Sequence, residues 1–144
     1  MYLIREPIDP SEFFECSNDE TSGARVLFLG KIRKYSEGKG VCYMEYEAYE
    51  EMADRIIKAL IDSAFRHWPV DNIRLLHRLG RVDLGEIAVA IDVRSAHREE
   101  AYQVSRYLIE KIKHNVPIWK KEYFEDGTNE WSLCQSHAEL SGSV

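Results

Sequence analysis

Basic side chains gather at both ends of the stretch from Ser95 to Lys121, although the chain as a whole is acidic. Its 144 residues contain 19 Lys and Arg against 25 Asp and Glu, a formal net charge of -6. His97 and Arg98 follow Ser95, which is expected to cap a long helix, and the free N–H groups at such a helix start favour an anion. This stretch is therefore predicted to form one wall of a site for an anionic substrate.

The helix start also has a simpler interpretation. Arg98 could pair with a neighbouring acid such as Glu99 while His97 lies on the surface, and most exposed ion pairs contribute little. On this motif alone, both interpretations stay open.

Lysines gather at the other end of the stretch, at Lys111, Lys113, Lys120 and Lys121. Lysines in the last turn of a helix complement its dipole, which accounts for Lys111 and Lys113. Lys120 and Lys121 follow on a predicted strand, where neighbours point to opposite faces, so at most one of them joins a shared site. A lysine among other cations can have a lowered pKa, which suits it to act as a base or nucleophile.

A further basic group ends the strand predicted over residues 24–33. Lys31 and Arg33 share a face of a regular strand, and Phe28 lies on the other face unless a bulge near Gly30 changes the alternation. A charged rim is common on sheets, so this signal is weak alone.

The elements that must position these groups follow from hydrophobic periodicity. Strands are predicted over 24–33, 41–48, 73–79, 87–93, 119–124 and 130–133, and long helices over 50–67 and from Ser95 to about Pro117, after a short strand and helix that ends near Cys16. The strands over 24–33 and 41–48 are expected to pair as a hairpin, as are the last two. Trp68, Trp119 and Trp131 are expected in the core, and His77 is expected to be partly buried. The order ββαββαββ predicts an α+β fold, mostly antiparallel, with helices mainly on one face.

Length and composition restrict the remaining possibilities. A single domain is expected over residues 1–134, with a polar tail over 135–144. The acidic balance argues against nucleic acid and an anionic membrane surface as partners, and no apolar run reaches the length of a membrane span. Cys16, Cys42 and Cys134 form neither a disulfide framework nor a zinc motif, which predicts a cytoplasmic protein.

Several phrases, in this order, resemble the large, catalytic subunit of molybdopterin synthase. They are Phe28-Leu29-Gly30-Lys31-Ile32-Arg33, Glu45-Tyr46-Glu47-Ala48-Tyr49, Trp68-Pro69, His77-Arg78-Leu79-Gly80, Ser95-Ala96-His97-Arg98 and Pro117-Ile118-Trp119-Lys120-Lys121-Glu122. Each phrase is weak alone, and the ordered set covers about residues 23–131. The resemblance implies the α+β fold sometimes called a hammerhead.

The resemblance implies an enzyme that adds two sulfurs to cyclic pyranopterin monophosphate to make molybdopterin. The pterin is the substrate, and no bound cofactor or metal is implied. The sulfur donor would be a thiocarboxylate on the C-terminal Gly-Gly of a small ubiquitin-like subunit. The resemblance also implies a homodimer that binds two small subunits, giving a heterotetramer.

Carried over by motif position, the implied catalytic residues are Lys113 and Lys120, and the implied substrate-binding residues are Arg33, His97, Arg98 and Phe28. The family often has an arginine shortly after the position of Trp131, where this chain has Gln135. The alternative function is a non-catalytic anion-binding or docking subunit on the same scaffold.

Overall fold

The main sheet of the protein holds four strands in the order β1-β5-β7-β2. They are β1 (Leu3–Ile4), β5 (Val70–Arg78), β7 (Ile87–Ser95) and β2 (Ala24–Lys31). The short β1 runs parallel to β5, and the other pairs are antiparallel. The structure, a computed structural model, describes residues 1–14 and 19–133, without the side chain of Leu133.

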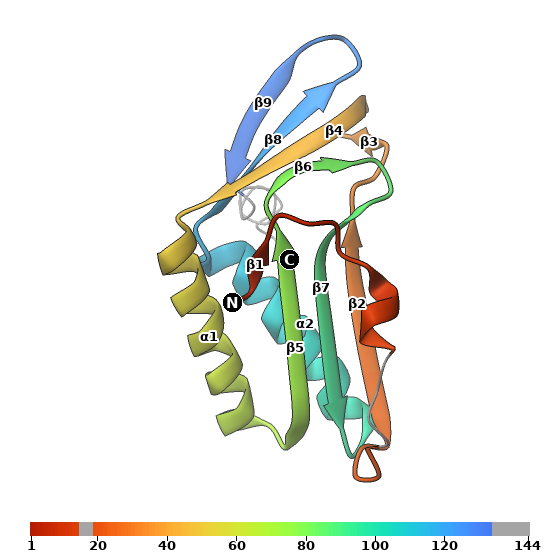
Figure 1. The fold of residues 1–144 in the computed structure, drawn as a ribbon, viewed down its shortest axis with the longest axis vertical. Coiled ribbons are helices and arrows are strands. Elements are labelled where there is room, and N and C mark those ends of the chain that lie inside the picture. The colour runs from red at the N-terminus through yellow and green to blue at the C-terminus, as the bar shows by residue number, and fades with distance from the viewer. Residues whose placement is uncertain (15–18, 134–144) are drawn as a thin grey trace.

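A second sheet lies across one end of the main sheet, at the top of Figure 1. Its strands are β3 (Tyr35–Ser36), β4 (Lys39–Ala48), β8 (Ile118–Phe124) and β9 (Asn129–Leu133), in this order, and β6 (Gly80–Asp83) also pairs with β4. The hairpin predicted between the last two strands is confirmed, and Gly127 in its turn has a φ of 85°, which glycine adopts without strain.

Two long helices cover one face of the main sheet. They are α1 (Glu50–His67) and α2 (Arg98–Asn115); α2 packs on β7 and β2, and α1 packs against α2 and β5 (Figure 1). The other face meets the short 3-10 helix η1 (Pro10–Phe13). The predicted α+β class, mostly antiparallel with helices mainly on one face, is confirmed. Among the described residues, no helix is long and apolar enough to cross a membrane.

β7 is the centre of the hydrophobic core because it is covered on both faces. Val89, Ile91 and Val93 belong to the cluster under the helices, while Ala90 packs with Phe13 on the opposite side. Full burial of such a side chain contributes roughly 1.5–3 kcal/mol. The apolar run from Ile87 to Ile91 is thus buried on both faces, and the core fixes the strand that forms the floor of the site.

The hairpin predicted between the strands over 24–33 and 41–48 is wrong. Among the described residues, β2 pairs with β7, whereas β4 pairs with β3, β6 and β8. The chain leaves the main sheet after Lys31 and makes a tight hairpin of its own at Glu37 and Gly38, both with positive φ. Such a turn matches the twist of the two strands that it joins, so β3 takes the place beside β4.

The predicted strand order also lacked two short strands. β3 and β6 are formed by segments that the sequence suggested to be connecting loops. β6 pairs through Val82 with Met44 of β4, and both side chains are buried. These segments have too few residues for hydrophobic periodicity to identify them.

Ser95 does not cap α2. It is the last residue of β7, fully buried, and its hydroxyl donates to the carbonyl of His97 at 2.5 Å. His97 is the N-cap residue and makes no side-chain capping bond. The error came from serine's preference for the cap, which the continuation of the strand overrides here.

Several large apolar residues are exposed. On α1 the buried residues are Ala53, Ile57, Ile61 and Ala64, whereas Met52 and Phe65 are exposed. Each of these two lies about 100° round the helix from a buried neighbour, at the margin of the stripe. Trp131, expected in the core, is 47% exposed on β9, and Trp119 is half-buried.

The N-terminal helix has Asp9 as its N-cap residue, whose side chain accepts from the N–H of Ser11 at 2.9 Å. It is a 3-10 helix that ends at Phe13. Cys16, Cys134, Gln135 and the predicted tail over 135–144 lie outside the described residues.

Candidate active site

A pocket with a volume of about 510 Å³ lies where the two sheets and the C-terminal end of α2 meet. Strands β2, β4, β5, β7 and β8 all contribute to it. Its lining residues are Phe28, Gly30, Lys31, Ile32, Arg33, Met44, Tyr46, His77, Ala88, Val89, Ile109, Ile112, Lys113, Ile118 and Lys120. The pocket therefore combines segments that are far apart in the sequence.

Four of the six predicted site residues line this pocket: Phe28, Arg33, Lys113 and Lys120. Phe28 and Arg33 lie on opposite faces of a regular strand, but the register of β2 against β7 shifts between Gly30 and Lys31. The chain then leaves the sheet, which brings Arg33 to the rim of the pocket that Phe28 lines. The bulge suggested near Gly30 is confirmed.

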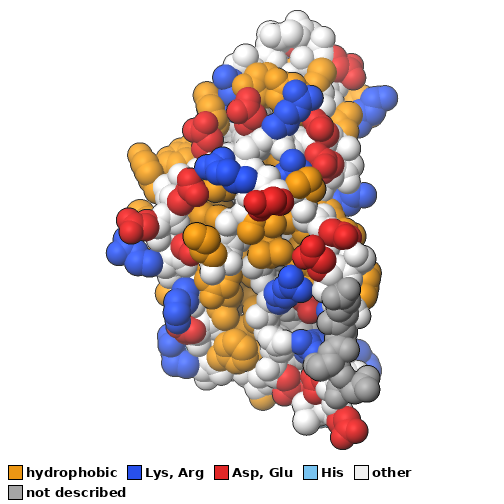
Figure 2. Space-filling model, in the orientation of Figure 1, with side chains coloured by type: hydrophobic (Ala, Val, Ile, Leu, Met, Phe, Trp, Pro, Cys, Tyr) orange, Lys and Arg blue, Asp and Glu red, His pale blue; other side chains and the backbone are white. Residues whose placement is uncertain are grey.

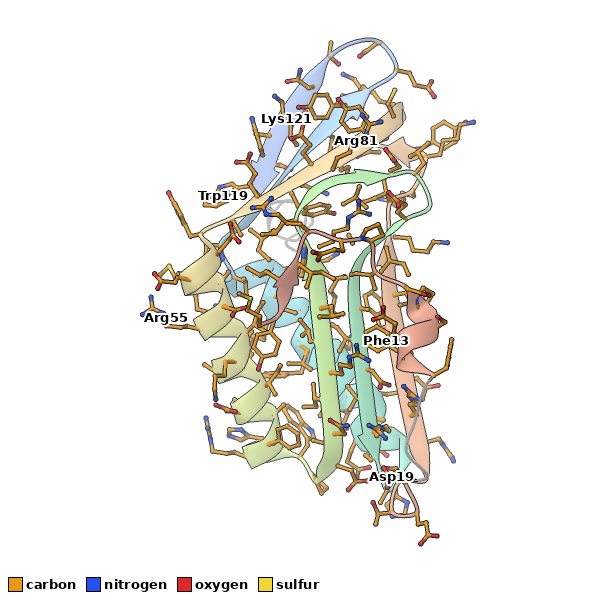
Figure 3. All side chains as sticks on the ribbon, viewed as in Figure 1. Phe13, Asp19, Arg55, Arg81, Trp119 and Lys121 are labelled. Carbon is orange, nitrogen blue, oxygen red and sulfur yellow. The ribbon has the colours of Figure 1, made fainter. Side chains whose placement is uncertain are left out.

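Lys120 and Lys121 take opposite faces of β8. The side chain of Lys120 is 17% exposed and lines the pocket. Lys121 lies on the other face of the second sheet (Figure 3), where its Nζ is 5.1 Å from the ring centre of Tyr123 and 5.3 Å from that of Trp131. Strand alternation thus gives the pocket one of the two lysines, as predicted.

A buried carboxylate, Glu122, lies two residues beyond Lys120 on the same face of β8. Its Oε1 is 3.9 Å from Nζ of Lys120, and its Oε2 is buried without a hydrogen-bond partner among the described residues. This distance is too long for a direct hydrogen bond, so Glu122 acts on Lys120 through its charge.

His97 and Arg98 do not line this pocket. Both are exposed at the start of α2, while Lys113 lies in its last turn. A helix of 18 residues is about 27 Å long, so one small ligand cannot contact both ends. Within one copy of the chain, the six predicted residues form two separate groups.

His77 and Tyr46 line the pocket, and sequence reasoning assigned neither to the site. His77 is 4% exposed, and its ring stands edge-on to that of Tyr46 with the ring centres 5.2 Å apart. Burial lowers the pKa of His77 to about 4, although a hydrogen bond with the carbonyl of Arg78 opposes the shift. The imidazole is therefore neutral at neutral pH.

The charges around the pocket favour an anion. Lys31, Arg33, Lys113 and Lys120 line it, and none of the described lining residues is acidic. By contrast, basic and acidic side chains are interspersed over the face of the second sheet in Figure 2. Most of the remaining lining is apolar, so the pocket suits a ligand with a flat apolar body and a negatively charged group. Ammonium groups there also stabilise negative charge that develops during a reaction.

No group of three or more His, Cys, Asp or Glu side chains that could hold a metal ion is present in the described part of the chain.

Comparisons with known proteins show the family of this chain. The family model described as "MoaE protein" matches residues 3–115. The molybdopterin synthase catalytic subunit of Staphylococcus aureus (strain COL) is 40% identical over 126 residues, which cover 88% of this chain and 85% of that protein.

Solved structures show the same fold. The crystal structure of molybdopterin synthase from Staphylococcus aureus matches with a TM-score of 0.83 and 39% identity, covering 91% of this chain and 95% of that one. A chain of a complex of subunits 1 and 2 of molybdopterin-converting factor from Helicobacter pylori 26695 matches with a TM-score of 0.74 and 22% identity, covering 91% and 88%. The chain therefore belongs to the MoaE protein family.

Proposed function

We propose that this protein is the catalytic subunit of a molybdopterin synthase, a sulfurtransferase of molybdenum cofactor biosynthesis. It transfers sulfur from a thiocarboxylated small subunit to cyclic pyranopterin monophosphate. The observation that carries this proposal is the pocket in which Arg33, Lys113 and Lys120 surround an apolar floor. The name and 40% identity of the Staphylococcus aureus relative support the same activity.

The pocket residues have distinct roles in this reaction. Phe28 and the other apolar side chains hold the flat pterin, and Arg33 at the rim attracts its phosphate. Lys113 at the end of α2 and Lys120 on β8 approach the acyl end of the sulfur donor. Their ammonium groups stabilise the anionic thiocarboxylate, whose sulfur forms the C–S bond to the pterin, and the carboxylate that the small subunit regains when water cleaves the acyl C–S bond. The pterin is a substrate, and the proposal includes no bound cofactor.

The partner in this proposal is a small ubiquitin-like subunit whose C-terminal Gly-Gly carries the sulfur. The Helicobacter pylori relative was solved as a complex of two subunits of molybdopterin-converting factor, which supports a small-subunit partner. A Gly-Gly end has no side chains, so it can enter a narrow pocket and bring the acyl carbon close to the lysines. We place the reaction in the cytoplasm, in keeping with the free thiol of Cys42.

We further propose that two copies of the chain share each site, which gives His97 and Arg98 a role. The start of β2 lies beside the start of α2, because Ala24 pairs with Ser95, and the end of β2 reaches the pocket at Lys31. β2 is also an edge strand among the described residues. Such an edge is open to pairing with another chain.

An antiparallel pairing of two β2 strands would place the start of one beside the end of the other. A strand of eight residues spans about 26 Å, which matches the length of α2. His97 and Arg98 of one protomer would then lie beside the pocket of its partner. This homodimer, with one small subunit for each copy, gives the predicted heterotetramer.

Reconstitution tests the activity. The purified protein is incubated with a thiocarboxylated small subunit and cyclic pyranopterin monophosphate, and the dithiolene product is measured. Formation of molybdopterin supports the proposal. Absence of product, while a known molybdopterin synthase works in parallel, contradicts it and leaves the anion-binding or docking subunit as the function.

A further inference from the structure

His77 is the one histidine among the described residues that line the pocket. The roles given above to the pocket residues do not use its ring nitrogens. It lies near the end of β5, opposite Val89 of β7. Because His77 is buried, an apolar side chain of similar volume would fill this position without the cost of burying a polar group. A polar ring here therefore needs a reason.

The hydrogen bonding of His77 fixes which nitrogen carries the proton. Its Nδ1 lies 2.9 Å from the carbonyl oxygen of Arg78. A carbonyl oxygen only accepts, so Nδ1 must hold the hydrogen and donate it. In the neutral ring, Nε2 then carries a lone pair and can only accept. The hydrogen bond of the ring to the described residues is made through Nδ1, which leaves Nε2 for a ligand.

The surroundings of the ring keep it in this form. His77 is 4% exposed, and the cations Arg33, Lys113 and Lys120 line the same pocket. A positive charge on the ring would be buried, which disfavours it. Burial lowers the pKa of His77 to about 4.

We infer that Nε2 of His77 accepts a hydrogen bond from an N–H group of the bound ligand and thereby contributes to substrate specificity. The inference rests on the proposed function, which supplies two ligands with such a group: the pterin ring and the amides of the Gly-Gly end. The charged groups of the pocket recognise the anion, whereas His77 recognises the part of the ligand that inorganic phosphate lacks. An unmet acceptor in a closed pocket is costly, so a ligand without a donor binds less tightly.

Two substitutions of His77 test the inference. His77→Phe keeps the ring volume but has no acceptor, and His77→Gln keeps a polar group near the position of Nε2. Binding of cyclic pyranopterin monophosphate, of a small-subunit peptide ending in Gly-Gly and of inorganic phosphate is measured by calorimetry. We expect H77F to weaken binding of one of the first two ligands about tenfold, H77Q to recover most of this loss, and phosphate binding to stay unchanged.

His67 provides the matched control. Its Nδ1 lies 2.8 Å from the carbonyl oxygen of Ser63, the same type of bond, but its ring is exposed at the end of α1. His67→Phe and His67→Gln should bind all three ligands like the wild type. If H77F binds cyclic pyranopterin monophosphate more weakly, the pterin ring is the hydrogen-bond donor to His77. If H77F binds the peptide more weakly, the donor is an amide of the Gly-Gly end.

The inference is overturned if H77F binds both ligands as tightly as the wild type, or if H77Q is as weak as H77F although both proteins melt cooperatively. A measurement on the wild type covers the case in which H77F does not fold. The ¹⁵N resonance of Nε2 of His77 should move when the N–H ligand is added and stay in place with phosphate, and an unchanged resonance at saturation rejects the inference. If the wild type binds the ligands but forms no sulfur product, only the proposed function is contradicted. If product forms but H77F binds both ligands as tightly as the wild type, only the role of His77 is contradicted.

Discussion

Lys120 and Lys121 are neighbours in the sequence, yet they serve opposite faces of one sheet. Nζ of Lys120 lies 3.9 Å from the buried carboxylate of Glu122, while Nζ of Lys121 lies over the rings of Tyr123 and Trp131. The alternation of β8 thus separates a pocket lysine from a surface lysine.

This separation predicts different effects of two alanine substitutions. Lys120→Ala removes an ammonium group from the pocket and should lower the rate of product formation about 100-fold. Lys121→Ala removes a cation–π contact from the outer face and should leave the rate within about twofold. Both rates are measured in the reconstituted reaction. Equal losses in the two variants would refute the assignment of Lys120.

A second prediction concerns the sharing of each site between two copies. Arg98→Ala and Lys113→Ala should each abolish most activity. In a mixed dimer of the two variants, one site carries both changes and the other carries neither. Random exchange of subunits should therefore restore about a quarter of wild-type activity.

The control for this experiment uses two residues from one pocket of a single copy. Mixing Lys113→Ala with Lys120→Ala leaves each site with at least one change, so no activity should return. Recovery in the control, or none in the first mixture, means that the two clusters do not meet across a dimer.

The third prediction concerns stability on the other face of the main sheet. Asp92 is 3% exposed and accepts from Nε and Nη2 of Arg25 at 2.8 and 2.9 Å. Asp92→Ala leaves the partly buried guanidinium without this partner and should lower the free energy of unfolding by about 3 kcal/mol. Urea denaturation measures the change.

Asp62 is the matched control for Asp92. It pairs with Lys58 at 3.0 Å on the exposed side of α1. Asp62→Ala should cost about 0.5 kcal/mol or less. Similar losses of unfolding free energy for the two variants would show that the buried ion pair contributes no more to stability than the exposed one.

The fourth prediction follows from the lowered pKa of His77. The folded protein keeps this ring neutral down to a pKa of about 4, whereas the unfolded chain takes up a proton near 6.5. Below pH 6.5 the unfolded state therefore binds more protons, and stability falls as the pH drops from 6.5 to 4. The contribution of His77 over this range is about 3 kcal/mol.

Comparison of the wild type with His77→Gln isolates this contribution, because the carboxylates titrate in both proteins. The free energy of unfolding, measured between pH 7 and pH 4, should fall more steeply for the wild type. Parallel curves would mean that the pKa of His77 is the same in the folded and the unfolded protein.

The sequence by itself determined the local elements and their faces. The stripe of α1, the fully apolar run in β7 and the alternation of Lys120 and Lys121 all depend on the period of a single helix or strand, so neighbouring residues reveal them. The ordered motifs also indicated the family and the six site residues. The predicted pairing of β2 with β4 was wrong because strand pairing depends on the partners that cover each face and edge of a strand. The local sequence pattern carries no information about those partners.

Only the tertiary structure decided which of these residues meet. The bulge after Gly30 brings Arg33 to the pocket of Phe28, and the crossing of two sheets at the end of α2 adds Lys113 and Lys120. The same packing places His77 in the lining and leaves His97 and Arg98 at the far end of the helix. Periodicity determines which side of an element faces inward, but a pocket forms where several elements end together, and that depends on contacts between distant parts of the chain.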